Sequence, residues 1–417
     1  MASDWYPLEV GEASFSRISL DFGLRGANQH FVELVVPGIG GTRFVRQLSW
    51  AVAGLAMRDT FREHGVKARA TPLANAIEAL GCKSEYQSDP GYRRVIGRRA
   101  FARDGADVAS FAELRERRHY VQNTFRATVV RALRDGMGLG FTRGARFDAL
   151  ELEPVGHQLA QALLDYARIG QGNATLRTWL RKWIGGDKVP TWTAVREVLS
   201  PRWPSKLERS IVRARLIEVD GPEAEKRKDL AGILMPEASF PGVDMVVSEL
   251  RRLKCEKHAR QVELAVAFGA LLDACIDVTR ELSAAIDRAG QLTLEAARKR
   301  VDIQLGAVVI ATTQYLARAE LSRSDSHTSA HRFALDATTR SREQLLVELL
   351  HREGRVCELV DGNVHMGPLF RNLRAIAADT DADEGEDEAE LGAPDAGEAR
   401  TFRLARFHEL LRDTRGG

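Results

Sequence analysis

Residues 245–321 constrain the fold more than any other stretch, because apolar side chains recur at near-helical spacing with no proline. Gly290 breaks the run and Thr293 is a typical cap for the helix that follows. The second half carries an almost strict heptad stripe: Leu294, Ala297, Val301, Leu305, Val308, Thr312, Tyr315 and Ala319. This pattern predicts a long antiparallel helical hairpin. The run 307–311 is apolar all round, which predicts burial on several sides.

A second apolar stretch, residues 30–64, joins two helical segments through a sharp turn at Pro37-Gly38 and Gly40-Gly41. Apolar residues share a face in each segment: Phe31, Leu34 and Val35 in the first, then Val45, Leu48, Val52 and Leu55. The pattern predicts a helical hairpin in the core. It does not predict a phosphate-binding loop, because the glycines lack the P-loop spacing and lysine, and no strand precedes them.

Other segments have a simpler pattern. Residues 111–136 predict one long helix capped by Ser110, and 219–244 predict a linker.

Residues 146–166 predict a strand, a turn and a helix. This order is similar to the wing-to-helix segment of winged helix-turn-helix modules; an unrelated strand–helix junction is the alternative. Asp361-Gly362 predicts a hairpin turn after a helix, and residues 402–411 predict an amphipathic helix that docks on this protein or a partner.

These patterns predict a mainly α, multi-domain helical protein with a long antiparallel helical hairpin and, on one interpretation, winged-helix-like elements. The expected ranges are 1–170, a basic helical domain with the winged-helix element; 171–244, a Trp-rich helical segment and linker; 245–378, the long hairpin with a helix and β-hairpin; 379–399, an acidic disordered linker; and 400–417, the amphipathic helix.

The net charge of +2 hides a strong asymmetry. Between Asp379 and Glu398 there are ten acidic residues and no basic one, so the rest of the chain carries a surplus of twelve positive charges. Such a surplus favours a polyanionic partner, above all nucleic acid, and DNA in particular.

Arginines cluster between residues 93 and 134, where guanidinium groups could bind phosphate bidentately. A solvated helix face is the alternative interpretation. The candidate nucleic-acid-binding residues are Arg93, Arg94, Arg98, Arg99, Arg115, Arg117, Arg118 and Arg126. Tryptophans at 179, 183, 192 and 203 are interleaved with basic residues; they are core or interface anchors, or else platforms on which bases stack.

The residues indicate no catalytic or metal site and no cofactor. Cys82, Cys255, Cys275 and Cys357 are scattered without a C-x-x-C pair, which fits a reducing cytoplasm. His327 and His331 have a spacing that zinc can use, but no third ligand suggests itself, so we interpret them as a polar helix start. No apolar run is long enough to span a membrane, and no secretion signal opens the chain, so we expect a cytoplasmic protein.

The first 165 residues or so resemble an uncharacterised bacterial family encoded in phage-defence islands beside helicases, methylases or phospholipase-D-type nucleases. The similarity rests on Val35-Val36-Pro37-Gly38, Thr42, Arg43, Arg46, Trp50 and Val95-Ile96-Gly97-Arg98. The family has no established catalytic residues, so the resemblance implies only a context, a component of a multi-gene antiviral system.

Three functions remain open from the sequence. The first is a non-catalytic DNA-associated subunit of a multi-component bacterial antiphage defence system, which contacts other defence-system subunits. The second is a scaffold or inhibitor whose acidic tail mimics nucleic acid, and the third is a cryptic metal-dependent nuclease.

Overall fold

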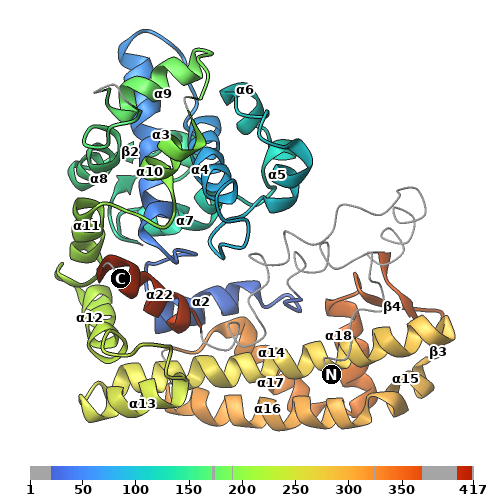
Figure 1. Cartoon of the computed structure of the whole chain (residues 1–417). Coiled ribbons are helices and arrows are strands. Elements are labelled where there is room, and N and C mark those ends of the chain that lie inside the picture. The colour runs from blue at the N-terminus through green and yellow to red at the C-terminus, as the bar shows by residue number, and fades with distance from the viewer. Residues whose placement is uncertain are drawn as a thin grey trace. The chain divides into compact units, whose positions relative to one another are not determined.

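The computed structural model describes residues 20–136, 138–170, 174–189, 191–322, 325–368 and 402–415 of the 417-residue chain. These residues are mainly helical, as predicted, and they form two compact units (Figure 1). Unit 1 consists of Met1–Val35 and Gly242–Arg403, and unit 2 of Val36–Pro241 and Leu404–Gly417. Each unit therefore combines two separate stretches of the chain, whereas the ranges expected from the sequence simply follow one another.

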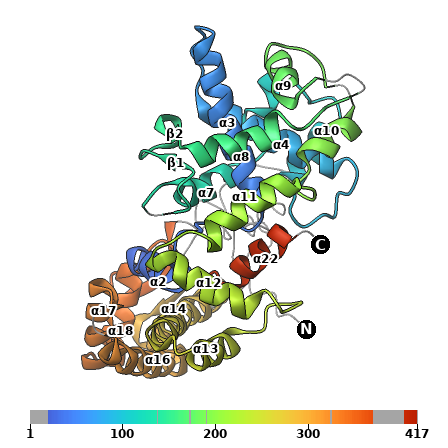
Figure 2. The ribbon, with the colours of Figure 1, turned by 90° about the vertical axis from the view of Figure 1, so that its left-hand side faces the viewer.

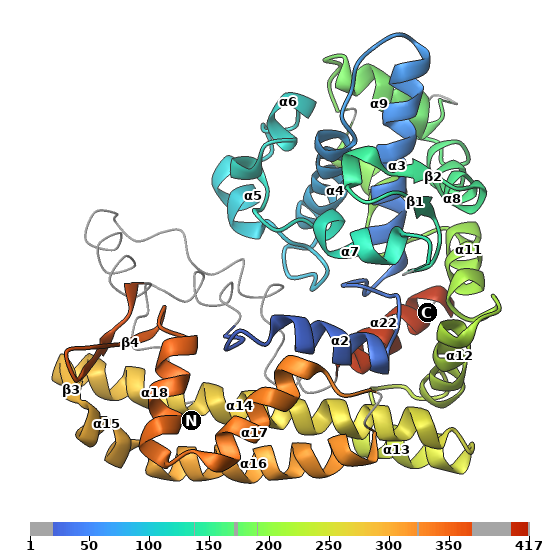
Figure 3. The same cartoon turned by 180° about the vertical axis from the view of Figure 1, so that it is seen from behind.

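Unit 1 is built on the antiparallel pair α14 (Glu256–Ala289) and α16 (Asp302–Leu321), which confirms the predicted long hairpin (Figures 1 and 3). Around this pair lie α2 (Arg25–Val35), α13 (Val243–Arg252), α15 (Leu294–Arg300), α17 (Thr328–Thr339) and α18 (Arg342–Arg352). Although α14 has 34 residues, neither it nor any other helix in the described ranges is long and apolar enough to cross a membrane.

The heptad stripe of α16 is the face that packs on the rest of unit 1. Leu305, Val308, Thr312, Tyr315 and Ala319 are all buried. The prediction that 307–311 is buried on several sides was wrong, because Ile310 is 62% exposed. Helix α16 lies at the margin of unit 1, so neighbouring helices cover only one side of it (Figure 2).

A small antiparallel sheet completes unit 1, with strand order β3 (Gln291–Thr293), β5 (Asn363–Met366), β4 (Cys357–Val360). The predicted hairpin turn is present: Asp361 and Gly362 have φ of 48° and 77°, the left-handed values that a type I′ turn requires. Strand β3 was not predicted, because it has three residues and pairs with β5 far along the chain. Elsewhere in unit 1, His327 caps α17 by accepting from Ser329 N, which agrees with a polar helix start.

The helices of the 30–64 stretch do not pack against each other as a hairpin. Phe31 of α2 contacts Phe268 of α14 with ring centroids 4.6 Å apart, and His258 Nε2 donates to the Val35 carbonyl oxygen at 2.9 Å. The next helix, α3 (Val45–Glu63), belongs to unit 2. The Pro-Gly turn therefore lies where the chain leaves unit 1, and the predicted hairpin is corrected accordingly.

Unit 2 has α3 and α4 (Ala70–Tyr86) at its centre. The two helices approach closely at Gly54, where a Cβ atom would lie 2.4 Å from Ala74 Cβ. The surrounding elements are α5 (Arg98–Asp104), α6 (Phe111–Leu114), η2 (Arg117–His119), α7 (Phe125–Leu133), β1 (Thr142–Arg143), η3 (Phe147–Ala149), β2 (Glu151–Leu152), α8 (Pro154–Leu164), α9 (Leu176–Ile184), α10 (Trp192–Leu199), α11 (Lys206–Ile217), α12 (Pro222–Leu234) and α22 (Leu404–Arg415).

Two predictions in unit 2 need correction. The predicted long helix over 111–136 is divided into α6, η2 and α7, and part of the predicted linker 219–244 is the helix α12. The amphipathic C-terminal helix is present as α22, and its apolar face packs on α11 and α12 of this same chain. The segment 146–166 contains η3, β2 and α8 in order, and its winged-helix interpretation stays a prediction. The acidic stretch 379–399 lies outside the described residues.

Candidate nucleic-acid interface

The positive surplus of the chain belongs entirely to unit 2. Its two stretches contain 37 Lys and Arg against 25 Asp and Glu, a difference of twelve. Unit 1 without the ten acids of 379–398 contains 23 basic and 23 acidic residues and is therefore neutral. All eight arginines predicted to contact nucleic acid lie in unit 2.

Three of these eight arginines are held by groups inside unit 2. Arg94 lies 2.5 Å from Asp413 Oδ1 and its guanidinium is 5.1 Å from the centre of the Phe44 ring. Arg98 donates to the Tyr92 carbonyl oxygen at 2.8 Å. Arg126 donates to Asn75 Oδ1 at 2.7 Å. Their hydrogen bonds fasten helices and loops of unit 2, so these three guanidinium groups are less accessible than those of the exposed members.

The remaining members are more accessible. Arg93, Arg115, Arg117 and Arg118 are exposed, whereas Arg99 is half-buried. Arg117 and Arg118 are neighbours on η2, and Arg115 lies just before it with its guanidinium 5.8 Å from the Phe111 ring centre. Arg118 forms an ion pair with Glu116 at 2.8 Å, yet its side chain is 73% exposed. The exposed arginines of 115–118 thus share one short segment.

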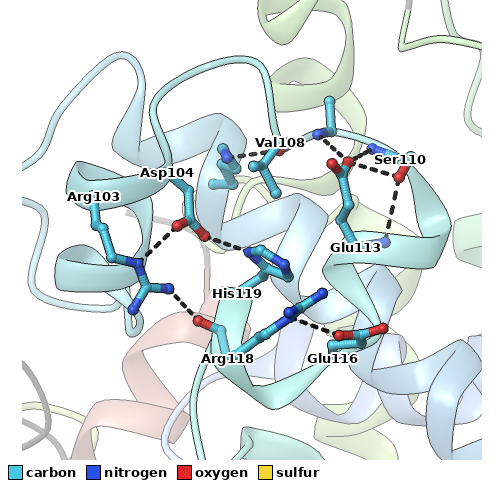
Figure 4. Close-up of polar contacts among 10 residues, drawn as sticks. Arg103, Asp104, Val108, Ser110, Glu113, Glu116, Arg118 and His119 are labelled. Atoms are coloured by element: carbon cyan, nitrogen blue, oxygen red, sulfur yellow. Dashed lines mark hydrogen bonds and ion pairs between the residues drawn. The ribbon is translucent and has the colours of Figure 1, made fainter.

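Asp104 lies at the centre of the polar contacts that hold this segment against α5 (Figure 4). Its carboxylate accepts hydrogen bonds from Arg103 Nε at 2.8 Å and His119 Nδ1 at 2.7 Å. Arg103 also donates to the carbonyl oxygen of Arg118. Burial alone would raise the pKa of Asp104, but the hydrogen bonds from Arg103 and His119 outweigh it and hold this pKa below its ordinary value. Asp104 therefore stays ionised and fixes the position of η2.

Two further groups order the loop before α6. The Ser110 hydroxyl caps α6 by accepting from Glu113 N, and Glu113 Oε2 accepts in turn from Ser110 N at 3.0 Å, which completes a capping box. Beneath the loop, the fully buried Lys83 donates to the Val108 carbonyl oxygen at 2.6 Å. Burial lowers the pKa of Lys83, while Asp104, Glu113 and Asp107 oppose that shift. Lys83 thus fastens the loop to α4 from the inside.

Aromatic rings of α9 support the same region. Trp183 is fully buried and donates through Nε1 to the Ala109 carbonyl oxygen at 2.9 Å, so it is a core anchor. Trp179 is half-buried and stacks on Trp183 with ring centroids 5.9 Å apart, and Phe111 meets the Trp183 ring edge-on. At the other end of the Trp-rich stretch, Trp203 is 44% exposed beneath the Arg196 guanidinium.

The pair Asp104–His119 resembles the oriented imidazole of a general base. Among the described residues, no serine, threonine or cysteine hydrogen-bonds to His119, and the Ser110 hydroxyl donates to Glu113. Likewise, in the part of the chain that the structure covers, no three His, Cys, Asp or Glu side chains gather to hold a metal ion.

Sequence reasoning named the arginines but not Lys83, Asp104 or His119, which determine how the arginine segment is held. No spacing rule connects residues 83, 104 and 119, because only the folding of α4, α5 and η2 brings them together. Comparison of the chain with family models, curated proteins and solved structures finds no match.

Proposed function

We propose that unit 2 binds the phosphate backbone of nucleic acid, most directly duplex DNA, and that the protein is a non-catalytic subunit of a larger assembly. The observation that supports this most is the confinement of the surplus of twelve positive charges to unit 2. A charge surplus in one compact unit attracts a polyanion and releases its counterions on contact.

The segment 115–118 is the proposed point of contact. Its three arginines are exposed, and the Asp104–Arg103–His119 contacts fix their backbone in advance. A segment that is already ordered loses less conformational entropy when it binds, so each phosphate contact contributes more to affinity. Backbone contacts of this kind position a protein on DNA without reading its sequence.

A salt titration tests the proposal. Binding of the full chain to a fluorescently labelled duplex is measured by anisotropy from about 50 to about 300 mM NaCl. We expect log K to fall linearly with log salt, and the triple variant R115Q/R117Q/R118Q to reduce the slope by about 3 because each lost contact removes about one ion. A flat slope in the unaltered protein would refute phosphate binding.

A matched control comes from unit 1. Arg252, Arg288 and Lys299 are also exposed, so R252Q/R288Q/K299Q removes the same charge from unit 1. We expect this control to keep the slope of the unaltered protein. An equal loss in both triple variants would mean that net charge alone, rather than segment 115–118, governs the affinity.

The acidic stretch between Asp379 and Glu398 supports a second candidate, a scaffold or inhibitor in which these ten acids imitate nucleic acid toward a partner protein. The antiphage setting of either candidate rests on the family resemblance of the first 165 residues and is proposed on that basis alone.

A further inference from the structure

Helix α16 carries a second heptad stripe that unit 1 does not cover. Its members follow one another at intervals of four and three residues: Ile303, Ala307, Ile310, Gln314, Ala317 and Leu321. All six are exposed, and Ile303, Ile310 and Leu321 are 84%, 62% and 63% exposed. The stripe is offset by two residues from the buried heptad, which places it about 200° around the helix. We call these six residues the outer stripe.

Single exposed apolar residues are ordinary, but a regular row of them along a helix is the pattern by which helices pair. The outer stripe contains no charged residue. In the view of Figure 1, α16 runs along the lower margin of unit 1.

The charges that flank the outer stripe already have partners in the same chain. Lys299 pairs with Glu295 at 2.6 Å, Asp302 with Arg298 at 3.1 Å, and Arg318 with Glu263 at 3.5 Å. A strongly charged partner would have to break these pairs, whereas a neutral apolar helix would not. A second outer stripe meets that requirement, because it has the same spacing and no charge.

We propose that the outer stripe pairs with the outer stripe of a second copy of this chain, with the two α16 helices parallel and in register. The orientation follows from Gln314, the only residue of the stripe with a hydrogen-bonding side chain. In a parallel pair the two Gln314 amides meet and satisfy each other, since each offers a donor and an acceptor. An antiparallel pair would instead place each Gln314 against Ile310. A polar residue at one position of a heptad seam also fixes the register.

The size of the seam sets the expected strength. From Ile303 to Leu321 the helix is about 27 Å long. One pair of helices of this length buries roughly 1,000 Å², the lower end of specific interfaces. We therefore expect a dimer that dissociates at micromolar concentrations and not a permanent one.

Sedimentation equilibrium of the full chain from about 1 to about 100 µM tests the pairing. We expect the mean mass to rise from monomer toward dimer. Ile310→Glu should keep the protein monomeric over this range, because two buried carboxylates would face each other. Leu335→Glu is the matched control: Leu335 is 47% exposed on α17, outside the outer stripe, and its substitution should leave the dimer intact. A protein that is monomeric throughout, or an Ile310→Glu variant that dimerises normally, overturns the proposal.

Disulfide cross-linking tests the orientation, in a Cys255→Ser background because Cys255 is the one described cysteine that is not buried. Ala307→Cys and Ala317→Cys both retain Gln314, and in a parallel pair each should form a dimer linked through identical positions. In an antiparallel pair position 307 would face position 317 of the second copy, so a dimer that cross-links at neither position alone, but only when the two variants are mixed, would refute the parallel arrangement. The parent Cys255→Ser protein, treated with the same oxidant, should give no linked dimer.

Discussion

Two carboxyl groups of unit 2, those of Asp104 and Glu78, have pKa values that their surroundings shift in opposite directions. Asp104 is held ionised by Arg103 and His119, as described above. Glu78 is 1% exposed and accepts hydrogen bonds from Phe125 N at 2.7 Å, Arg126 N at 2.8 Å and the Tyr120 hydroxyl at 2.8 Å. These bonds favour the carboxylate, but burial outweighs them and raises the pKa of Glu78 to about 7.

The raised pKa of Glu78 predicts a specific pH dependence of stability. Because the folded-state pKa is about 7 and the ordinary value 4.5, the folded protein keeps a proton that the unfolded chain has lost between these values. Stability should therefore fall as pH rises through this window, by roughly 1.4 kcal/mol per pH unit at most. Glu78→Gln cannot titrate, so the stability advantage of the unaltered protein over this variant should shrink from about pH 5 to about pH 7.

Urea unfolding of both proteins at several pH values measures this difference. Glu197→Gln, an exposed change on α10, is the matched control, and the pH dependence assigned to Glu78 should persist in this variant. If the stability advantage of the unaltered protein over Glu78→Gln stays constant or grows with pH, the three hydrogen bonds, rather than burial, dominate the pKa of Glu78.

At the scale of the elements, the C-terminal helix α22 holds other elements of unit 2 in place through hydrogen bonds. Asp413 on α22 accepts from Val45 N at 2.8 Å and so caps α3, the central helix. The other oxygen of the Asp413 carboxylate accepts a hydrogen bond from the Arg94 guanidinium at 2.5 Å. His408 adds a hydrogen bond to the Glu237 carbonyl oxygen at 3.0 Å. One side chain near the end of the chain thus completes the start of a helix encoded more than 300 residues earlier.

Removal of this cap should destabilise unit 2. We expect Asp413→Ala to lower the free energy of unfolding by about 2–3 kcal/mol, because it removes the α3 cap and leaves a half-buried Arg94 without its carboxylate. Glu409→Ala is the control, since Glu409 is an exposed acid on the same helix. Urea unfolding followed by circular dichroism measures both variants, and equal losses in the two would contradict the assigned role.

Helix boundaries illustrate what local sequence can and cannot predict. The heptad of α16, the Asp361-Gly362 turn and the capping box at Ser110 were predictable, because each depends on residues a few positions apart. The division of 111–136 into α6, η2 and α7 was not. Glu78 and Asp104 stabilise the start of α7 and the position of η2 from other helices, and nothing within 111–136 encodes them.

At the scale of the whole molecule, we expect the ten acids between Asp379 and Glu398 to compete with DNA for the positively charged surface of unit 2. Replacing these ten acids by Asn and Gln raises the net charge from +2 to +12 without shortening the chain. If unit 2 binds DNA, duplex affinity at low salt should stay equal or increase, because a tethered competitor has been removed. If the stretch instead imitates nucleic acid, binding to the partner protein should be lost.

The measurement is the same anisotropy titration, with a variant that shuffles the order of residues 379–399 as control. The shuffled stretch keeps its charge, so its duplex affinity should match that of the unaltered protein. A marked loss of duplex affinity on neutralisation would contradict DNA binding by unit 2.

The candidate interface, like the helix boundaries, was only partly predictable, because residues distant in the chain decide how its side chains are held. The abundance of arginine in 93–134 is visible in the sequence, but which guanidinium groups face outward depends on Asp413, Tyr92 and Asn75, which contact Arg94, Arg98 and Arg126. Conversely, the apolar run 307–311 was predicted to be buried on several sides, although Ala307 and Ile310 belong to the exposed outer stripe, because local composition does not show which side of α16 the neighbouring helices cover.

The sequence by itself determined the helical class, the long hairpin, the β-turn and the separation of charge, because these depend on local periodicity and composition. Only the tertiary structure decided that α2 belongs to unit 1 and α22 to unit 2, and which side of α16 is covered. Those outcomes depend on which apolar faces bury each other, and burial is a property of pairs of surfaces that are distant in the chain.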